Sequence, residues 1–331
     1  MKKFGMGFPW PTEDPFLFCA HHNDHYPPGN YEQGLDRASL SDRALGSDFT
    51  IKNGFRMYHG KSVPGFPYHP HCGFETITLV TKGYIDHSDS LGAKARFGKG
   101  DVQWMTAGSG VQHSEMFPLL DTEKSNKLEL FQIWLNLPKA SKYVDPHFDM
   151  IWDHEVPKWK KEGVFTRLIY GSHGGFEQHK CPPNSWAVHS ENQLVVAQFI
   201  LAPGAVLSLD KVNVGISRNL YLYDGEELIY DEGSLTKNEG LKLKASDRVT
   251  LTNSSKKEAS LILMQGKPIN EPVAKYGPFV MNESHEIESV IAKYRITEFG
   301  GWPWPKAEMT HGSEPIRFAT YPDQTTIYAE K

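Results

Sequence analysis

The chain has 331 residues, 39% hydrophobic and 12% aromatic, which suffices for one large or two medium domains with their own cores. Its formal net charge of −5 at pH 7 and its lack of basic runs interleaved with aromatic residues argue against nucleic acid and anionic membranes as partners. No apolar run has signal-peptide length and none reaches the ~20 apolar residues of a membrane span, so we expect a cytoplasmic protein.

Most of the chain consists of short segments in which polar and apolar residues alternate, separated by glycine or proline. This pattern is typical of an all-β protein. A short helix is predicted near residues 39–46. The most clearly predicted strands are, in chain order, residues 75–83, 101–108, 128–138, 193–204 and 241–253.

The clearest helix is predicted at residues 283–295, where Asn282 can cap the first turn. Its apolar residues recur at the helical spacing i, i+3, i+4 and i+7, namely at Ile287, Val290, Ile291 and Tyr294. We expect the helix to pack this face on a barrel.

The order of polar turn, aspartate, alternating strand and second turn occurs twice, at residues 97–110 and 243–255. This internal repeat predicts two related β-units. We expect four parts: a first barrel at residues 1–150, a connecting segment at 151–185, a second barrel with the helix at 186–297, and a C-terminal extension at 298–331 that packs on the barrels.

Two pairs of side chains have the spacing of neighbours on one face of a strand. His69 and His71 are one residue apart in "YHPHCGFETITLV" (68–80), and His113 and Glu115 repeat this spacing in "GVQHSEMF" (110–117). Successive side chains alternate between the two faces of a strand, so each pair shares a face. If the run stays extended through Gly73, then Glu75, Ile77 and Leu79 lie on the face of the two histidines.

If these strands are neighbours in one barrel, three imidazoles and a carboxylate converge in a small apolar space. Unpaired buried polar groups cost ~2–7 kcal/mol each, so a bound cation is the least costly arrangement. Nitrogen and carboxylate donors without thiolate suit Fe(II), Mn(II), Ni(II), Cu(II) or Zn(II). A core histidine is more often a hydrogen-bonded packing residue than a ligand, and it is the second pair that favours a metal site.

The other histidines give weaker signals. His21, His22 and His25 cluster in "CAHHNDHYPPGN", where we expect a solvated loop rather than a second metal site. His87 in "IDHSDS" is expected to shape a turn. The second unit has no comparable pair of histidines, so we expect it to be structural or to provide a binding surface.

The segment 66–118 closely resembles the pirin family through two long motifs, "HPHCGFET" (69–76) and "GDVQWMTAGSGVQHSE" (100–115). The similarity continues at residues 128–138 and 266–282. It covers most of residues 15–296.

The resemblance implies a bicupin, which is two β-barrels in one chain, with one metal ion, usually iron, in the N-terminal barrel. The family ligands fall on His69, His71, His113 and Glu115. Glu75 occupies a position that is a ligand in many other cupins but not in pirins, so we expect it to have a supporting or structural role.

The sequence departs from the family pattern in two places. Cys72 stands where pirins commonly have arginine, and residues 299–331 extend past the usual end, as in a bacterial pirin-like subgroup. Cys19, Cys72 and Cys181 form no CxxC pair, and we expect free thiols.

The resemblance implies two functions. The first is a dioxygenase of the quercetin 2,3-dioxygenase type that opens flavonols with O2, in which Glu115 or a nearby carboxylate takes a proton from the flavonol. Its apolar pocket would be lined by Phe55, Phe66, Phe74, Met105, Met116, Phe117 and Phe131.

The second is a non-catalytic regulator whose iron oxidation state alters binding to a protein partner. A sugar-phosphate isomerase fits less well, since no cluster of lysine and arginine lies near the ligand strands to bind phosphate, and Lys94 and Arg96 are the nearest candidates. We expect a monomer.

Overall fold

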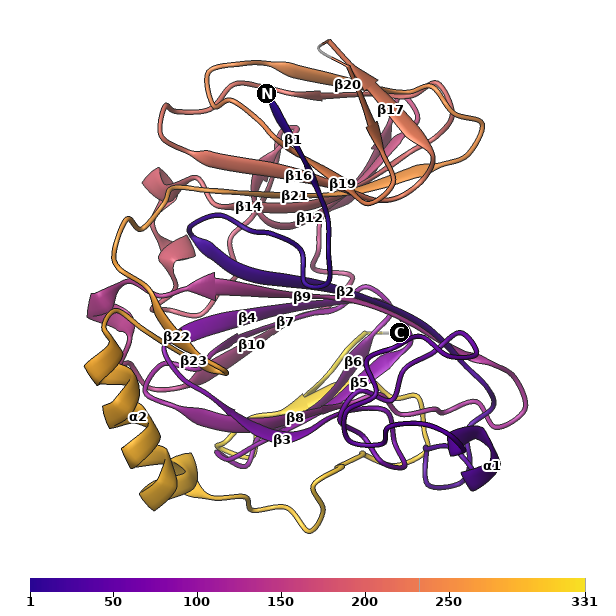
Figure 1. Cartoon of the computed structure of the whole chain (residues 1–331), viewed down its shortest axis with the longest axis vertical. Helices are drawn as coiled ribbons and strands as arrows, with labels where there is room; N and C mark the ends of the chain where they lie inside the picture. Colours follow the sequence, from indigo (N-terminus) through magenta and orange to yellow (C-terminus); the bar gives the residue numbers. More distant parts are fainter. Residues whose placement is uncertain (232, 331) are drawn as a thin grey trace. The chain divides into compact units, whose positions relative to one another are not determined.

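The computed structural model describes residues 1–231 and 233–330, and antiparallel strands dominate it (Figure 1). This confirms the predicted all-β class. The chain divides into two compact units. The first unit comprises His21–Gln132, Lys139–Asp153 and the chain from Glu271 onward, and the second comprises Met1–Ala20, Ile133–Pro138 and His154–Asn270.

Two sheets form the first unit. One has the order β10 (His147–Ile151), β7 (Val102–Thr106), β4 (Phe74–Lys82), β9 (Asn126–Asn136) and β2 (Phe16–Tyr26), the last two strands also extending into the second unit. The other has the order β25 (Thr326–Tyr328), β24 (Phe318–Thr320), β6 (Lys94–Gly98), β5 (Tyr84–Asp89), β8 (Val111–Met116) and β3 (Gly65–His71).

The core of the first unit lies between these sheets. Val80, Met105 and Leu130 come from the first sheet, and Phe97 and Val111 from the second. Alternation along each strand turns these side chains inward, which explains why the sequence shows a period of two.

The first unit also contains the hairpin β22 (Ala274–Tyr276) and β23 (Phe279–Met281), with helices α1 (Arg37–Leu40) and α2 (Ser284–Thr297). The apolar face predicted for α2 is confirmed, since Ile287 and Val290 are buried against Cys72, Phe279 and Met281. No helix among the described residues is long and apolar enough to span a bilayer.

The predicted cap of α2 is wrong. Glu283 is the N-cap, and its side chain and that of Glu286 bond each other's backbone in a capping box. The side chain of Asn282 instead donates to the Glu271 carboxylate and the Pro272 carbonyl.

The second unit is also built from two sheets. The larger has the order β1 (Lys2–Gly5), β19 (Glu239–Lys242), β16 (Ser217–Asp224), β21 (Ala259–Gly266), β14 (Val195–Leu201), β12 (Val164–His173) and β11 (Lys158–Lys161), with β13 (Phe176–Gln178) also on β12. The smaller has the order β15 (Val206–Leu209), β20 (Val249–Asn253), β17 (Glu227–Tyr230) and β18 (Gly233–Thr236).

These units differ from the predicted boundaries. Residues 271–297, which include α2, lie in the first unit, and β1 pairs with β19 in the second. The expected connecting segment contributes β11, β12 and β13 to the second unit's larger sheet. The single strand predicted at 241–253 is two strands, β19 and β20, because a turn near Asp247 separates them.

Candidate metal centre

Strand pairing brings the two motifs together. β3 and β8 are antiparallel neighbours, and His69 lies directly opposite His113 in their register. Opposed residues on neighbouring strands share a face of the sheet, and His71 lies two residues further along β3 on the same face. The predicted convergence of the three imidazoles is therefore present in the structure.

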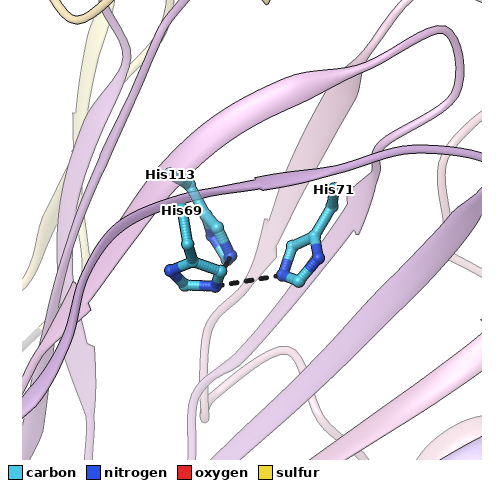
Figure 2. Close-up of side chains that lie close together, drawn as sticks. All are labelled: His69, His71 and His113. Carbon is cyan, nitrogen blue, oxygen red and sulfur yellow. Dashed lines mark hydrogen bonds between the residues drawn. The ribbon is translucent and has the colours of Figure 1, made fainter. Parts of the chain in front are cut away.

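The three rings point toward one another (Figure 2). The Nε2 atom of His69 lies 3.1 Å from Nε2 of His71 and 3.1 Å from Nε2 of His113. One nitrogen from each ring lies within 4.8 Å of the others, and in the described chain these histidines are the one cluster of this kind.

The protonation state of the rings suits metal binding. Burial lowers the pKa of His69 to about 4 and the pKa values of His71 and His113 well below 6.5, so all three are neutral at pH 7. Nδ1 of His69 lies 2.9 Å from the Pro67 carbonyl, which can only accept, so this nitrogen carries the proton. Nε2 of His69 therefore presents a lone pair to the other rings.

Hydrogen bonding leaves this cluster incompletely satisfied. Nδ1 of His113 is buried without a partner among the described residues, and one lone pair on His69 faces two nitrogens. A divalent cation would accept lone pairs from all three rings at once, so the residues fit a metal ion.

Glu115 lies at the edge of the cluster rather than within it. Its Oε2 atom is 3.8 Å from Nε2 of His113 and accepts a hydrogen bond from Gln132 at 3.1 Å, while Oε1 accepts one from Thr78 at 3.3 Å. Burial raises the pKa of Glu115 to about 7, although His87 and the hydrogen bonds from Thr78 and Gln132 lower it. A nearby cation would favour the ionised form.

Comparison with known protein families shows to which family the chain belongs. Residues 11–135 match the model of the pirin family, and residues 196–300 match that of the pirin C-terminal cupin domain. The chain belongs to the pirin family.

Two relatives illustrate the pirin similarity. A pirin-like protein of Solanum lycopersicum is 34% identical over 238 residues, which cover 71% of this chain and 77% of the tomato protein. Human pirin is 33% identical over 250 residues, covering 74% of this chain and 81% of its own.

A solved structure, quercetin 2,3-dioxygenase from Acinetobacter baumannii, has a TM-score of 0.70 at 23% identity, covering 91% of this chain and 98% of that one. The two proteins share the bicupin fold. Pirin-family proteins typically bind a metal, and the three imidazoles of this chain could hold one.

Hydrogen bonds within its own sheet hold Glu75, which agrees with the supporting role that the pirin pattern implies. Its two carboxylate oxygens accept hydrogen bonds from Trp104 Nε1 at 3.1 Å and from Thr106 Oγ1 at 2.6 Å. The prediction that Glu75, Ile77 and Leu79 share the face of His69 and His71 is wrong.

The cause is a break in the extended run. The chain passes from one sheet to the other at Cys72 and Gly73, and Gly73 has a φ of +85°, which favours glycine. A Cβ atom at Gly73 would also collide with the Val280 carbonyl. The opposite face of β4 therefore looks toward the site, and it carries Thr78.

The expectation that His87 shapes a turn is wrong. It lies in strand β5, not in a turn, directly opposite Glu115, and its Nε2 is 3.2 Å from the Asp89 carboxylate. Its ring centroid is 5.5 Å from that of His113. His87 and Asp89 form a third pair spaced i, i+2, and this repetition could have indicated the site. Nothing comparable indicates Gln132.

The cluster of His21, His22 and His25 is not a loop. All three lie in strand β2, where His22 is buried and His25 is exposed. His21 Nε2 lies 3.2 Å from the Glu129 carboxylate. The strand forms because His22, Asp24 and Tyr26 alternate with exposed residues.

The expected pocket residues have different environments. Phe66 and Phe74 lie against the imidazoles, with ring centroids 6.1 Å from His69 and 5.1 Å from His71. Others belong to the core between the sheets or stack elsewhere: Phe55, Met105 and Phe117 are core residues, and Phe131 stacks on His21.

Arg96 is not available to bind phosphate. It is fully buried, and its guanidinium donates to the Asp86 carboxylate at 2.7 and 2.6 Å. It also donates to the carbonyls of Gly312 and Glu314. The sugar-phosphate alternative loses one of its two candidate cations.

Proposed function

We propose that the chain is a metal-dependent oxygenase of the quercetin 2,3-dioxygenase type, which opens flavonols with O2. His69, His71, His113 and Glu115 would hold one divalent ion, Fe(II) first, with Mn(II), Ni(II), Cu(II) and Zn(II) as alternatives. The observation that carries this proposal is the convergence of three neutral imidazole nitrogens in one buried site.

The comparisons support the reaction type. A Pseudomonas aeruginosa relative, provisionally named a quercetin 2,3-dioxygenase, is 33% identical over 237 residues, which cover 71% of this chain and 79% of that protein. Such an ion supplies Lewis acidity toward a substrate oxygen and, in the case of iron, electron exchange with O2.

The chain's own residues would position the substrate and move its proton. The carboxylate of Glu115, fixed by Thr78 and Gln132, would accept the proton of the flavonol hydroxyl. The rings of Phe66 and Phe74 would contact the flat apolar body of a flavonol.

The decisive experiment combines metal analysis with oxygen uptake. Wild-type protein is purified without added metal, and its metal content, quercetin consumption, O2 uptake and CO release are measured. We expect His113→Ala to lose most of the metal and the O2 uptake. The matched control is His25→Ala, which removes an exposed histidine of the same unit and should change neither.

The outcomes separate the two parts of the proposal. Full metal retention in His113→Ala would contradict the ligand assignment. Metal-loaded wild-type protein that consumes no O2 with a flavonol would contradict the oxygenase. Partner capture that depends on Fe(II) rather than Fe(III) would then favour the regulatory alternative.

A further inference from the structure

Two polar residues lie at one edge of the apolar interior of the second unit. Apolar side chains from both sheets fill this interior, among them Leu220 of β16 and Leu263 of β21. Arg218 lies two residues before Leu220, and Gln265 lies two residues after Leu263, so both share the inward face of their strands. The strand register places them opposite each other.

Arg218 is a buried cation without a carboxylate partner. Arg218 is only 2% exposed, and it forms no ion pair with any of the described residues. Nε donates to Gln265 Oε1 at 3.1 Å, and Nη1 donates to the carbonyls of Lys244 and Asp247, both at 3.4 Å. Within the described chain, Nη2 makes no hydrogen bond.

A guanidinium in this position favours an anion. Arginine stays charged in proteins, and removing its charge from water without a counter-ion is costly. The two N–H groups of Nη2 remain, and they can form charge-assisted hydrogen bonds with a carboxylate.

A cavity of about 480 Å³ opens beside Arg218. This volume is within the range of small-molecule sites. Val195, Leu207 and Leu263 line it together with Arg218 and Gln265, so an apolar patch and one buried cation lie within a lining that is otherwise mainly polar.

The charges at the rim of the cavity also favour an anion. Lys161, Lys211 and Arg248 line it with Arg218, against the carboxylates of Glu162 and Asp210. Burial lowers the pKa of Arg218, and the charge of Asp210 offsets this only in part; the Asp210 side chain is 85% exposed and lies 3.5 Å from Arg248. The net positive lining attracts anionic ligands.

We propose that this cavity of the second unit binds a small organic carboxylate. The carboxylate accepts hydrogen bonds from Nη2 of Arg218, and the apolar body of the ligand contacts Val195, Leu207 and Leu263. A carboxylate fits better than phosphate, because one guanidinium is the only buried cation lining the described cavity and an apolar patch lies beside it. The site shares no residue with the imidazole cluster.

The proposal is tested by calorimetric titration of the full chain with sodium benzoate. Benzamide, which has nearly the same shape without the charge, is the matched control ligand. We expect benzoate to bind with a Kd in the millimolar range. Benzamide and inorganic phosphate should bind at least about tenfold more weakly.

Variants locate the binding energy. Arg218→Met keeps an unbranched apolar stem but removes the guanidinium and its charge, and should weaken benzoate binding about tenfold or more. Arg248→Met removes a charge at the rim and should weaken it about threefold or less. His113→Ala should bind benzoate as the wild type does, which separates this site from the proposed oxygenase.

A crystallographic measurement on the wild type covers the case in which Arg218→Met does not fold. In crystals grown with 4-bromobenzoate, anomalous scattering locates the bromine. Bromine in the cavity beside Arg218 supports the proposal. Bromine found only elsewhere, or benzamide binding as tightly as benzoate, overturns it.

Discussion

Cys72 directly follows the two histidines of β3, at a position where pirins commonly have arginine. Its thiol is buried: Sγ donates to the Gly108 carbonyl at 3.2 Å, and burial raises its pKa to about 11, so we expect it to be unreactive in the folded protein. Burial also raises the pKa of Cys19, whereas Cys181 is partly exposed. Because the thiolate is the reactive form, we predict that Ellman's reagent labels Cys181 alone in native protein and all three thiols after unfolding.

The control for this prediction is Cys181→Ser, which should show no rapid labelling until the protein is unfolded. Prompt labelling of Cys72 in that variant would mean that the segment after His71 opens readily in solution.

Glu75 and Glu115 are buried carboxylates with different environments. The Trp104 N–H can only donate, so a glutamine at position 75 would have to turn its oxygen to Trp104 and its NH2 to Thr106, which exchanges two hydrogen bonds to a carboxylate for weaker neutral ones. We predict that Glu75→Gln lowers the free energy of unfolding by about 1–3 kcal/mol while leaving the metal content unchanged. Glu115→Gln is the matched comparison and should lower metal affinity. An equal loss of metal in both variants would place Glu75 at the metal.

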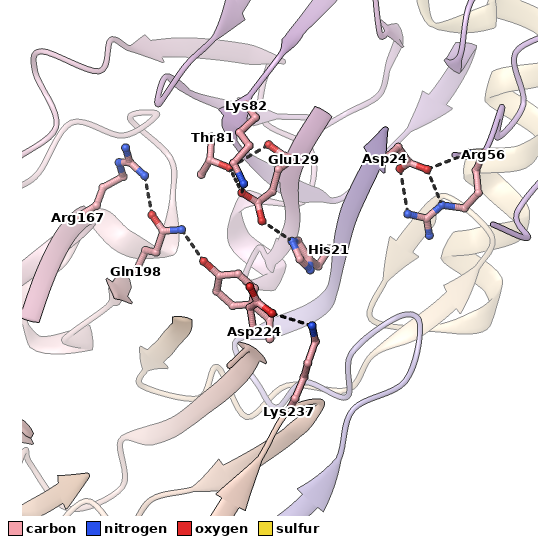
Figure 3. A network of polar contacts seen from close by, with 11 residues as sticks. His21, Asp24, Arg56, Thr81, Lys82, Glu129, Arg167, Gln198, Asp224 and Lys237 are labelled. Atoms are coloured by element: carbon pink, nitrogen blue, oxygen red, sulfur yellow. Dashed lines mark hydrogen bonds and ion pairs between the residues drawn. The ribbon is translucent and has the colours of Figure 1, made fainter. Parts of the chain in front are cut away.

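At the scale of strands, Glu129 of β9 joins its neighbours in the sheet (Figure 3). Its carboxylate lies 3.2 Å from His21 of β2 and 2.7 and 3.0 Å from Thr81 and Lys82 of β4. Burial alone would raise the pKa of Glu129, but hydrogen bonds from His21, Thr81 and Lys82 outweigh it and lower the pKa to about 2.

The sign of the resulting pH effect follows from this lowered pKa. The folded state holds the carboxylate ionised at a pH where the unfolded chain has already bound a proton. The stabilisation is therefore fully present above the unfolded pKa near 4.5 and is lost as pH falls toward 2.

We predict that Glu129→Gln lowers the free energy of unfolding by about 1–3 kcal/mol at pH 7. The difference from wild type should shrink between pH 4.5 and 2. Urea titrations across this range measure it. Glu123→Gln, at an exposed position, is the control and should be neutral. A deficit that stays constant with pH would show that the contribution of Glu129 is packing rather than charge.

At the scale of the whole chain, local sequence patterns predicted the features that depend on neighbouring residues, such as strands and the faces of side chains within one strand. Alternation predicted several of the strands, and the i, i+2 spacing predicted that His69 and His71 share a face, because the pairing of β3 with β8 is regular from His69 to His71. The predicted face of Glu75 was wrong, because the orientation of this side chain depends on a change of sheet at Gly73. That change is stabilised by contact with residue 280, which local sequence does not reveal.

The same limit explains the errors over larger distances. Helix α2 was assigned to the second barrel from its order in the chain, but its apolar face packs on Cys72 of the first unit. Likewise, His22 looked like a loop residue, whereas it is buried beside the Tyr58 ring, with centroids 4.8 Å apart. In both cases the partner is far away in the sequence.

The C-terminal extension is an integral part of the first unit. β24 pairs with β6, and Phe318 lies opposite Arg96. Carbonyls of Gly312 and Glu314 accept hydrogen bonds from the buried guanidinium of Arg96. The Trp302 ring stacks on Tyr68, the neighbour of His69, with centroids 5.0 Å apart.

We predict that truncation after Gly300 lowers the free energy of unfolding of the first unit by at least about 3 kcal/mol, because Arg96 loses buried acceptors and β6 becomes an edge strand. Metal affinity should fall as well, because Tyr68 loses the stack that holds the strand next to His69. Calorimetric unfolding and metal titration measure the two effects, and Trp302→Ala separates them by removing the stack and one hydrogen bond to the Lys306 carbonyl while leaving β24 and the acceptors of Arg96 in place. It should weaken metal binding with little change in unfolding. A truncated chain with unaltered stability would mean that the Arg96–Asp86 pair and its sheet hold without the extension.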